Sequence, residues 1–421
     1  MSEVGIFAAV LFGYSLLSRR LERLSVSAPM AMVAAGIVLG PDVLDLIEVE
    51  LTGETGLLIA EVALVVVLFA DASRIDLATL RENRGLPVRL LGIGMPLTIA
   101  LGTAAGALLL TGIEFWEAAM VAAVLAPTDA ALGQAVVSSD RVPSRIRQAV
   151  NVESGLNDGL SIPFLFLFTG LALSEAGVDA AGWLGFAAEQ IGIGAAVGIG
   201  AGLAGGWLVD RSNLRRWITP TFGQISMLAL AVGAWALAGE LGGNGFIAAF
   251  TAGLAAGRTA KAHSVKIVDF TEDEGQLLNL AVFFLFGISA VGFLEGAGWE
   301  VFLYGALSLT AIRMLPVALA LATSSLRPVS IAFVAWFGPR GLASIILALI
   351  VIEEEPGLPA ISTLFAAMTV TVLASIVAHG VSARPLTRAY GRRMEKLDED
   401  EAEMLPAIEM PVRGSIADPL E

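Results

Sequence analysis

The sequence predicts an all-α polytopic membrane protein with thirteen transmembrane helices. The first reason is composition: 56% of the 421 residues are hydrophobic and only 15% are charged, which is too apolar for a soluble domain of this length. The second reason is that apolar segments of membrane length, separated by charged or Gly/Pro-rich loops, recur along almost the whole chain. The absence of cysteine excludes disulfides and thiolate metal sites, and two histidines leave little for a histidine-based metal centre.

The thirteen apolar segments lie near residues 3–18, 26–40, 56–71, 87–111, 115–137, 146–172, 182–209, 217–238, 242–257, 275–295, 300–322, 328–352 and 360–383. The first segment has no positive charge before it, whereas Arg19, Arg20 and Arg23 follow it. This order favours a first span over a cleaved signal peptide.

The basic residues test this count, because the positive-inside rule requires them in alternate loops. They do alternate, and the intervening loops at 41–55 and 353–360 contain none. One helix more or fewer would break the alternation. We therefore expect a multi-pass protein of the cell (plasma) membrane, with its N-terminus outside and its C-terminus in the cytoplasm. Residues 397–421 form an acidic cytoplasmic tail that we expect to be disordered.

Thirteen spans divide into six, one and six, which allows the second six to repeat the first in inverted orientation. Two corresponding spans are interrupted, the fifth at 126–129 (APTD) and the twelfth at 337–341 (FGPRG). Because proline removes a backbone donor and clashes with the preceding turn, we expect both helices to open within the membrane; a simple kink is the alternative for either one alone. Asp129 and Arg340 would neutralise the half-helix ends that meet there.

The seventh span carries glycines at intervals of four, which give it one face suited to close helix approach. These are Gly194, Gly198, Gly202 and Gly206. The pattern fits packing against neighbours in the same chain and fits a dimer contact equally well.

The sixth span contains the densest group of polar residues. A carboxylate at the bilayer centre costs about 3 kcal/mol on insertion scales, so several together indicate an ion pathway. Ser154 and Asp158 are four residues apart and share one helix face. With Asp129 and the Thr128 carbonyl freed at the break, they offer the hard oxygen ligands that a dehydrated monovalent cation prefers.

Glu153 and Asn157 form a neighbouring pair on the same helix. We expect Glu153 to belong to a buried ion pair, for which Arg313 and Arg340 are the available membrane arginines. Asp71, at the end of the third span, is a weaker candidate ligand that fits a residue at the cytoplasmic interface equally well.

These motifs resemble those of the monovalent cation/proton antiporters, in particular the NhaP-like sodium/proton antiporter branch. The matching residues are Pro127-Thr128-Asp129, the run ESGLND at 153–158 and the run GPRG at 338–341. The resemblance implies a transmembrane domain over residues 1–396 with two crossing broken helices and alternating access. It implies a core domain including spans 3–6 and 10–13, a dimerisation domain including spans 1, 2 and 7–9, and a homodimer.

The resemblance also implies the activity, which is exchange of Na⁺ or Li⁺ for H⁺ through competition for Asp158. Asp129, Ser154 and the Thr128 carbonyl would assist it, and Glu153 would pair with Arg313. As the neutral neighbour of the carrier, Asn157 places the chain in the branch associated with one-for-one, electroneutral exchange. The partners would be the cation, the proton and the bilayer, with no cofactor, no nucleic acid and no enzymatic reaction.

One residue position, Asp71, and two alternative functions qualify this interpretation. Relatives can have glutamate at the position of Asp71, and the shorter side chain puts direct ligation in doubt. A sodium-coupled symporter of organic anions could share inverted repeats and broken helices. An intramembrane aspartyl protease could use Asp129 and Asp158, but the Gly-x-Gly-Asp element is absent.

Overall fold

The computed structural model of the chain describes residues 3–47, 49, 51–75, 85–129, 132–175, 180–259, 264–354, 358, 360–398 and 401–405. Within these ranges the ordered elements are helices and no strand occurs. Eight of the described helices are long and apolar enough to cross a membrane, and four shorter apolar helices accompany them. The all-α, multi-pass membrane fold is therefore confirmed. The count of thirteen crossings stays a prediction.

In chain order the helices are α1 (Glu3–Arg23), α2 (Ala28–Leu39), α3 (Glu54–Ser73), α5 (Gly85–Arg89), the π-helix η1 (Leu90–Gly94), α6 (Met95–Leu109), α7 (Phe115–Val124), α8 (Gln134–Val137), α9 (Ser144–Glu175), α10 (Ala180–Leu214), α11 (Pro220–Glu240), α12 (Gly245–Thr259), α13 (Ser264–Ser289), the 3₁₀ turn η2 (Gly292–Leu294), α14 (Trp299–Leu309), α15 (Ala311–Leu321), α16 (Pro328–Trp336), α17 (Leu342–Glu354) and α18 (Ile361–Met394).

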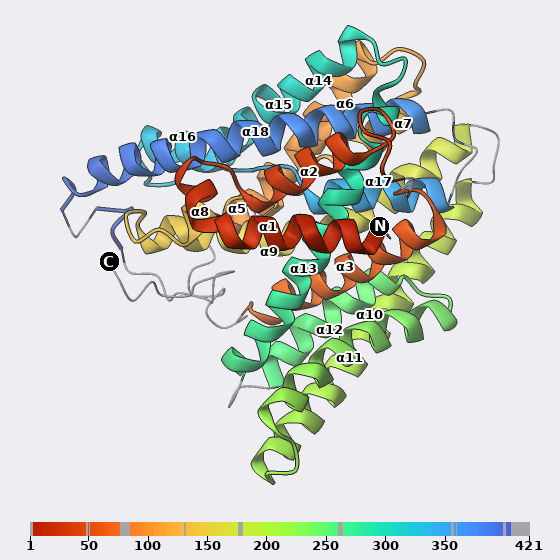
Figure 1. Cartoon of the computed structure of the whole chain (residues 1–421), viewed down its shortest axis with the longest axis vertical. Helices are drawn as coiled ribbons and strands as arrows, with labels where there is room; N and C mark the ends of the chain where they lie inside the picture. The colour runs from red at the N-terminus through yellow and green to blue at the C-terminus, as the bar shows by residue number, and fades with distance from the viewer. Residues whose placement is uncertain are drawn as a thin grey trace.

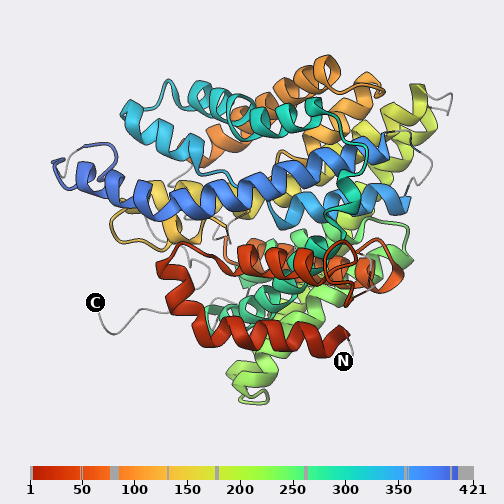
Figure 2. The same ribbon diagram turned by 45° about the horizontal axis from the view of Figure 1, so that its top comes forward.

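The helices pack in two groups, which lie above and below one another in Figures 1 and 2. One group contains α2, α3 and α10 to α13, and the other contains α6, α7, α9 and α14 to α18. We expected the third and tenth spans in the core domain. In the structure α3 and α13 pack mainly with each other and with α2, α11 and α12. A functional division into two domains stays a prediction.

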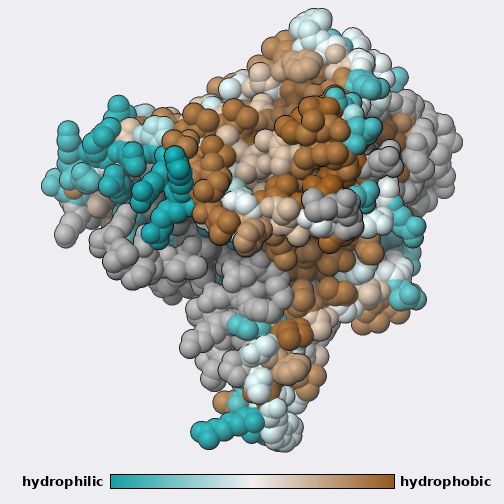
Figure 3. Space-filling view, viewed as in Figure 1, coloured by the Kyte–Doolittle hydropathy of each residue, from teal (hydrophilic) through white to brown (hydrophobic). Residues whose placement is uncertain are grey.

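The surface has the polarity of a membrane protein on the face drawn in Figure 3. Apolar side chains cover its middle, and hydrophilic side chains gather at the left, where α1 and α18 end. The exposed apolar residues include Phe12 and Leu16 on α1, at 67% and 69% of their maximal exposure. In water such exposure would be costly, whereas against lipid it is favourable.

The glycine face of the seventh span packs within the chain. Of these four glycines, Gly198, Gly202 and Gly206 face α12, and Gly194 faces Asn244 directly before it. A Cβ on Gly198 or Gly202 would lie 2.3 Å from a backbone oxygen of α12. Atoms do not approach so closely, so any side chain here would push the two helices apart. Of the two uses left open by the sequence, the structure selects the contact inside the chain.

Both predicted helix breaks are present, and they meet. In the fifth span the first half-helix, α7, ends at Val124. In the twelfth span the first half-helix, α16, ends at Trp336. Residues 127–129 and 337–341, which follow these half-helices, are not helical, and the Asp129 N–H donates to the Pro339 carbonyl at 2.8 Å. The prediction of two crossing broken helices is therefore confirmed. The inverted-repeat relationship itself continues to rest on the sequence.

The eleventh span is also interrupted, which we did not expect. Helix α14 ends at Leu309 and α15 begins at Ala311, with Thr310 between them at φ −113° and ψ −97°. A π-helical turn, η1, likewise interrupts the fourth span directly before Met95 and Pro96. Such turns relieve local mismatches in the ladder of helical hydrogen bonds.

The first part of the expected disordered tail is packed against the helices. The Glu403 side chain is fully buried, and its Oε1 accepts hydrogen bonds from the Arg327 N–H at 2.7 Å and the Ser330 hydroxyl at 2.8 Å. Both donors lie at the start of α16. This part of the tail therefore packs against α16 in the structure, and disorder of the tail stays a prediction. Residues 406–421 lie outside the described part of the chain.

Candidate functional site

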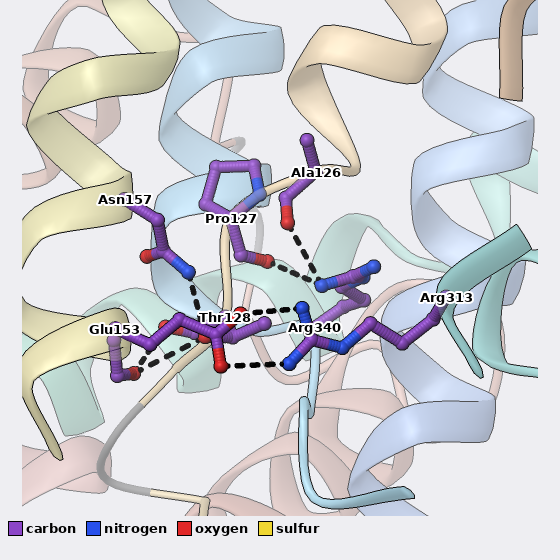
Figure 4. A network of polar contacts seen from close by, with 8 residues as sticks. Ala126, Pro127, Thr128, Glu153, Asn157, Arg313 and Arg340 are labelled. Atoms are coloured by element: carbon purple, nitrogen blue, oxygen red, sulfur yellow. Dashed lines mark hydrogen bonds and ion pairs between the residues drawn. The ribbon is translucent and has the colours of Figure 1, made fainter. Parts of the chain in front are cut away.

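The two broken helices each place a charged side chain on the other. The Arg340 guanidinium donates from Nη1 to the Ala126 carbonyl at 2.9 Å and to the Pro127 carbonyl at 3.0 Å (Figure 4). These carbonyls follow the end of α7, where no helical N–H is available to them. In return, Asp129 Oδ2 accepts the Leu342 N–H at 2.9 Å, at the start of α17.

These reciprocal contacts of Arg340 and Asp129 match the electrostatics of helix ends. The C-terminal end of a helix carries partial negative charge and its N-terminal end partial positive charge, so a cation suits the first and an anion the second. Arg340 and Asp129 are both buried, at 0% and 5% exposure. Since neither charge reaches water, hydrogen bonds to the backbone are needed to offset the cost of burial.

Thr128 is the point at which the broken fifth span contacts α9. The Ser154 hydroxyl donates to the Thr128 carbonyl at 2.5 Å. Asn157 Nδ2 donates to the Thr128 hydroxyl at 2.7 Å (Figure 4). All three residues are at most 3% exposed. The structure therefore brings together the backbone oxygen of the break and two of the polar residues that the sequence singled out on α9.

Asp158 lies one helical turn after Ser154 on the same face of α9 and is 8% exposed. Its backbone carbonyl accepts the Ser161 hydroxyl at 2.7 Å. Asp158 therefore adds a buried carboxylate to the face of α9 that contacts the break.

Glu153 and Arg313 form a two-point ion pair beside this contact. Arg313 Nη1 lies 2.6 Å from Oε1 and Nη2 lies 2.9 Å from Oε2, with both side chains 2% exposed. Removing one partner from such a pair leaves a buried, unpaired charge, which costs about 3–5 kcal/mol. The pair also borders the second break, because a Cβ on Gly338 would lie 2.4 Å from Arg313 Nε.

Asp71 lies beside the site on α3. A Cβ on Gly155, the residue after Ser154, would be 3.7 Å from the Asp71 Cβ. Asp71 therefore faces α9 at this position. Its carboxylate is 3.9 Å from Arg74 Nη1, and both side chains are buried. The structure thus places Asp71 near the α9 residues rather than in open solvent, and it leaves the role of Asp71 as a ligand a prediction.

Two residues of α18 that the sequence analysis passed over also contact the second break. The Ser375 hydroxyl accepts the Arg340 N–H at 2.7 Å, and His379 Nε2 lies 2.9 Å from the Trp336 carbonyl. The available sequence signal was a polar pair four residues apart in an otherwise apolar span. It was weak, because a serine and a histidine on one helix face carry no ligand pattern of their own.

The resulting site is built from hard oxygen atoms in a dry environment. A backbone carbonyl, a hydroxyl and carboxylates suit a dehydrated monovalent cation, and a buried carboxylate can alternatively bind a proton. No thiolate ligand is available, because the chain contains no cysteine.

Known proteins resemble this chain in sequence and in fold. The family described as "Sodium/hydrogen exchanger, transmembrane" matches residues 6–389. The K⁺/H⁺ antiporter NhaP of Alkalimonas amylolytica is 26% identical over 80% of this chain, and the K⁺/H⁺ antiporter NhaP2 of Shewanella sp. (strain ANA-3) is 26% identical over 89% of it. The chain spans 58% and 64% of the length of these two relatives.

The fold agrees with that of a solved structure. The sodium proton antiporter MjNhaP1 from Methanocaldococcus jannaschii at pH 8 superposes with a TM-score of 0.75, at 22% sequence identity, over 92% of this chain and 98% of that one. At this identity the likeness establishes the antiporter fold alone. The family match is independent of it and covers nearly all of the predicted transmembrane domain. The chain therefore belongs to the sodium/hydrogen exchanger family.

Proposed function

We propose that this protein is a secondary active antiporter that exchanges Na⁺ or Li⁺ for H⁺ across the membrane. The observation that carries the proposal is the contact of Ser154 with the Thr128 carbonyl at a helix break, one turn from the buried Asp158. If Asp158 must be neutral before the site crosses between the two faces, a cation and a proton compete for it. One ion then drives the other without a further energy source.

Asn157 supports a one-for-one, electroneutral exchange. Its amide donates to the Thr128 hydroxyl, so it takes part in the site without a charge of its own. Glu153 is held by Arg313 and is assigned a structural role. Asp158 is then the carboxylate that binds the cation and the proton in turn. Asp129, Ser154 and Thr128 supply further oxygen atoms.

The surrounding assembly belongs to the same proposal. We place the protein in the plasma membrane as a homodimer, with its N-terminus outside and its C-terminus in the cytoplasm. The alternation of basic loops supports this orientation. We also propose a core domain that includes spans 3–6 and 10–13 and a dimerisation domain that includes spans 1, 2 and 7–9.

Transport by purified protein in liposomes tests the proposal. We expect a Na⁺ or Li⁺ gradient to drive proton movement, and Asp158→Asn to abolish it, because the amide of similar size cannot exchange a proton for a cation. The matched control is Glu189→Gln, which removes a carboxylate from α10 away from the site and should leave exchange intact. Wild-type exchange by Asp158→Asn would refute the assignment.

The same assay separates the cations and the alternatives. Two relatives are named as K⁺/H⁺ antiporters, so K⁺ is compared with Na⁺ and Li⁺ in parallel. An electroneutral exchanger keeps its rate when a membrane potential is imposed, whereas an electrogenic one does not. Proton movement that required an added organic anion would instead indicate a symporter.

A further inference from the structure

His379 is the one histidine among the described residues, and it is buried beside the break in the twelfth span. It lies on α18, is 1% exposed, and has the rings of Trp336 and Phe337 beside it at centroid distances of 5.1 Å and 6.4 Å. Its polar contacts go to the last carbonyl of α16 and to Ser375 on its own helix. A buried imidazole with defined partners on both nitrogens has a fixed orientation.

The partners assign the proton on the His379 ring. Nε2 lies 2.9 Å from the Trp336 carbonyl, which can only accept, so Nε2 carries a proton. Nδ1 lies 3.2 Å from the Ser375 hydroxyl, which can donate to it, and 3.0 Å from the Ser375 carbonyl, which could accept only if Nδ1 also carried a proton. A second proton would add a charge to a ring that is 1% exposed, so we assign the neutral ring.

These bonds form one continuous chain along the break. The Arg340 N–H donates to the Ser375 hydroxyl, the Ser375 hydroxyl donates to His379 Nδ1, and Nε2–H donates to the Trp336 carbonyl. The Trp336 carbonyl also accepts the Gly338 N–H at 2.8 Å, which closes a tight turn where α16 ends. Helix α18 therefore holds the non-helical stretch at residues 337–341 near both of its ends.

The held stretch is also the one that contacts the candidate cation ligands. The Pro339 carbonyl accepts the Asp129 N–H, and the Leu342 N–H binds the Asp129 carboxylate. Since close-packed interiors transmit small displacements, a shift of the stretch would move Asp129 and the neighbouring Thr128. The position of these ligands thus depends on bonds made from α18.

We propose that His379 is a positioning residue for the cation site, which acts through the Trp336 carbonyl and Ser375 on the break in the twelfth span. It contacts neither the cation nor the transported proton. This proposal rests on the proposed antiport function, because it assigns a role in setting the affinity of that same site.

Substitutions that copy one ring nitrogen at a time test the proposal. Glutamine places its amide N–H near the position of Nε2, whereas asparagine reaches only the position of Nδ1. We expect His379→Ala to raise the apparent KM for the cation about fivefold, as for the loss of one net hydrogen bond, with little change in maximal rate. His379→Gln should restore the KM, and His379→Asn should not.

Ser375 provides a second arm with a matched control. Ser375→Ala removes the acceptor of the Arg340 N–H and should also raise the KM. Thr371→Val removes another buried hydroxyl of α18, one turn away, which donates only to the Ala367 carbonyl of its own helix, and should leave the KM unchanged. Equal KM values for the alanine and wild-type proteins, or an asparagine variant as good as the glutamine variant, would overturn the proposal.

The pH profile distinguishes positioning by a neutral ring from a proton switch. A charged ring would donate from Nδ1 to the Ser375 carbonyl, which lies 3.0 Å away, and would release the Ser375 hydroxyl. Because glutamine does not titrate, His379→Gln should keep the wild-type pH profile of exchange. A flattened or shifted profile would contradict positioning by the neutral ring.

Hydrogen exchange of the backbone amides provides a readout that needs no transport. His379→Ala should speed exchange at Gly338, Arg340 and Leu342 in detergent-solubilised protein, and His379→Gln should restore the slow rate. Unchanged amide exchange in His379→Ala would overturn the positioning role. An inactive wild-type protein with the expected amide exchange would instead refute the proposed function and leave the structural link in place.

Discussion

The two half-helices that lead into the breaks, α7 and α16, begin in different ways. Helix α7 has a capping box of its own, in which Glu117 accepts the Glu114 N–H at 2.8 Å and the Glu114 side chain caps the first turn. Helix α16 has no capping side chain from its own first turn. Glu403, from the tail, accepts the Arg327 N–H instead. The first half-helix is thus specified locally, and the second depends on a distant part of the chain.

The breaks themselves differ in the same sense. The break in the fifth span presents Thr128 to α9, where its carbonyl and hydroxyl meet Ser154 and Asn157. The break in the twelfth span presents its backbone to α18 and its Arg340 side chain to the fifth span. We conclude that the first break supplies atoms to the candidate site, whereas the second supports the first.

Replacing Arg340, which links the break in the twelfth span to the break in the fifth, should have the largest effect. Arg340→Met keeps much of the bulk but leaves the buried carbonyls of Ala126 and Pro127 without their donor. Hydrogen bonds to a charged group are worth about 1.5–3 kcal/mol each, so we expect the free energy of unfolding to fall by about 2–3 kcal/mol after the relief of the buried charge is counted. Exchange in liposomes should be lost.

Arg340→Lys is the control, because it keeps the charge and one donating group. We expect partial exchange and a smaller loss of stability, since a single ammonium cannot reproduce the planar geometry of the guanidinium. If Arg340→Met exchanged ions at the wild-type rate, the second break would not support the first.

Asp129 allows the two roles of the first break to be separated. Asp129→Asn keeps an oxygen for the Leu342 N–H but removes the charge, whereas Asp129→Ala removes both. We expect the cation affinity to fall about tenfold in both variants. Only the alanine variant should also lose about 1 kcal/mol of stability through the lost helix cap. Thermal unfolding and transport titrations measure the two effects. Wild-type affinity in Asp129→Asn would reduce Asp129 to a capping residue.

The same contrast decides what the sequence could predict. Pro127 and Pro339 predicted both breaks, because the effect of proline on a helix is local. Glu153 and Asp158 stood out because charges inside a span are costly wherever they lie. By contrast, His379 and Glu403 act through helix faces and a tail segment far away in the sequence. Their partners depend on how the spans pack, and neither residue belongs to a recognisable motif.

The packing of the spans escaped prediction for a related reason. Hydropathy places a segment in the membrane but does not say which neighbour it will contact. Helices α3 and α13 lie with α12 and α2 because small residues allow close approach, as where a Cβ on Gly253 would lie 2.4 Å from the Phe69 carbonyl oxygen. Such complementarity belongs to pairs of helices, so one helix alone does not disclose it.

The smallest predicted effect concerns Glu403, the tail residue that caps the start of α16. Glu403→Gln keeps an acceptor for the Arg327 N–H and the Ser330 hydroxyl but removes a negative charge from the start of the helix. That charge is worth about 0.3–1 kcal/mol, so we expect a small decrease in the free energy of unfolding and an unchanged cation KM. Glu403→Ala leaves the buried Ser330 hydroxyl without this acceptor and should cost about 1–3 kcal/mol.

Glu117→Gln is the matched variant on α7, because it alters the capping box of the other half-helix. If α16 depends on the tail, Glu403→Ala should make the amides at the start of α16 exchange faster, and α7 should be unaffected. Glu117→Ala should do the reverse, because its carboxylate serves the Glu114 N–H and, at 3.2 Å, the Ala360 N–H. Faster exchange in both half-helices from either substitution would mean that the caps stabilise the crossing as one unit and not each half-helix separately.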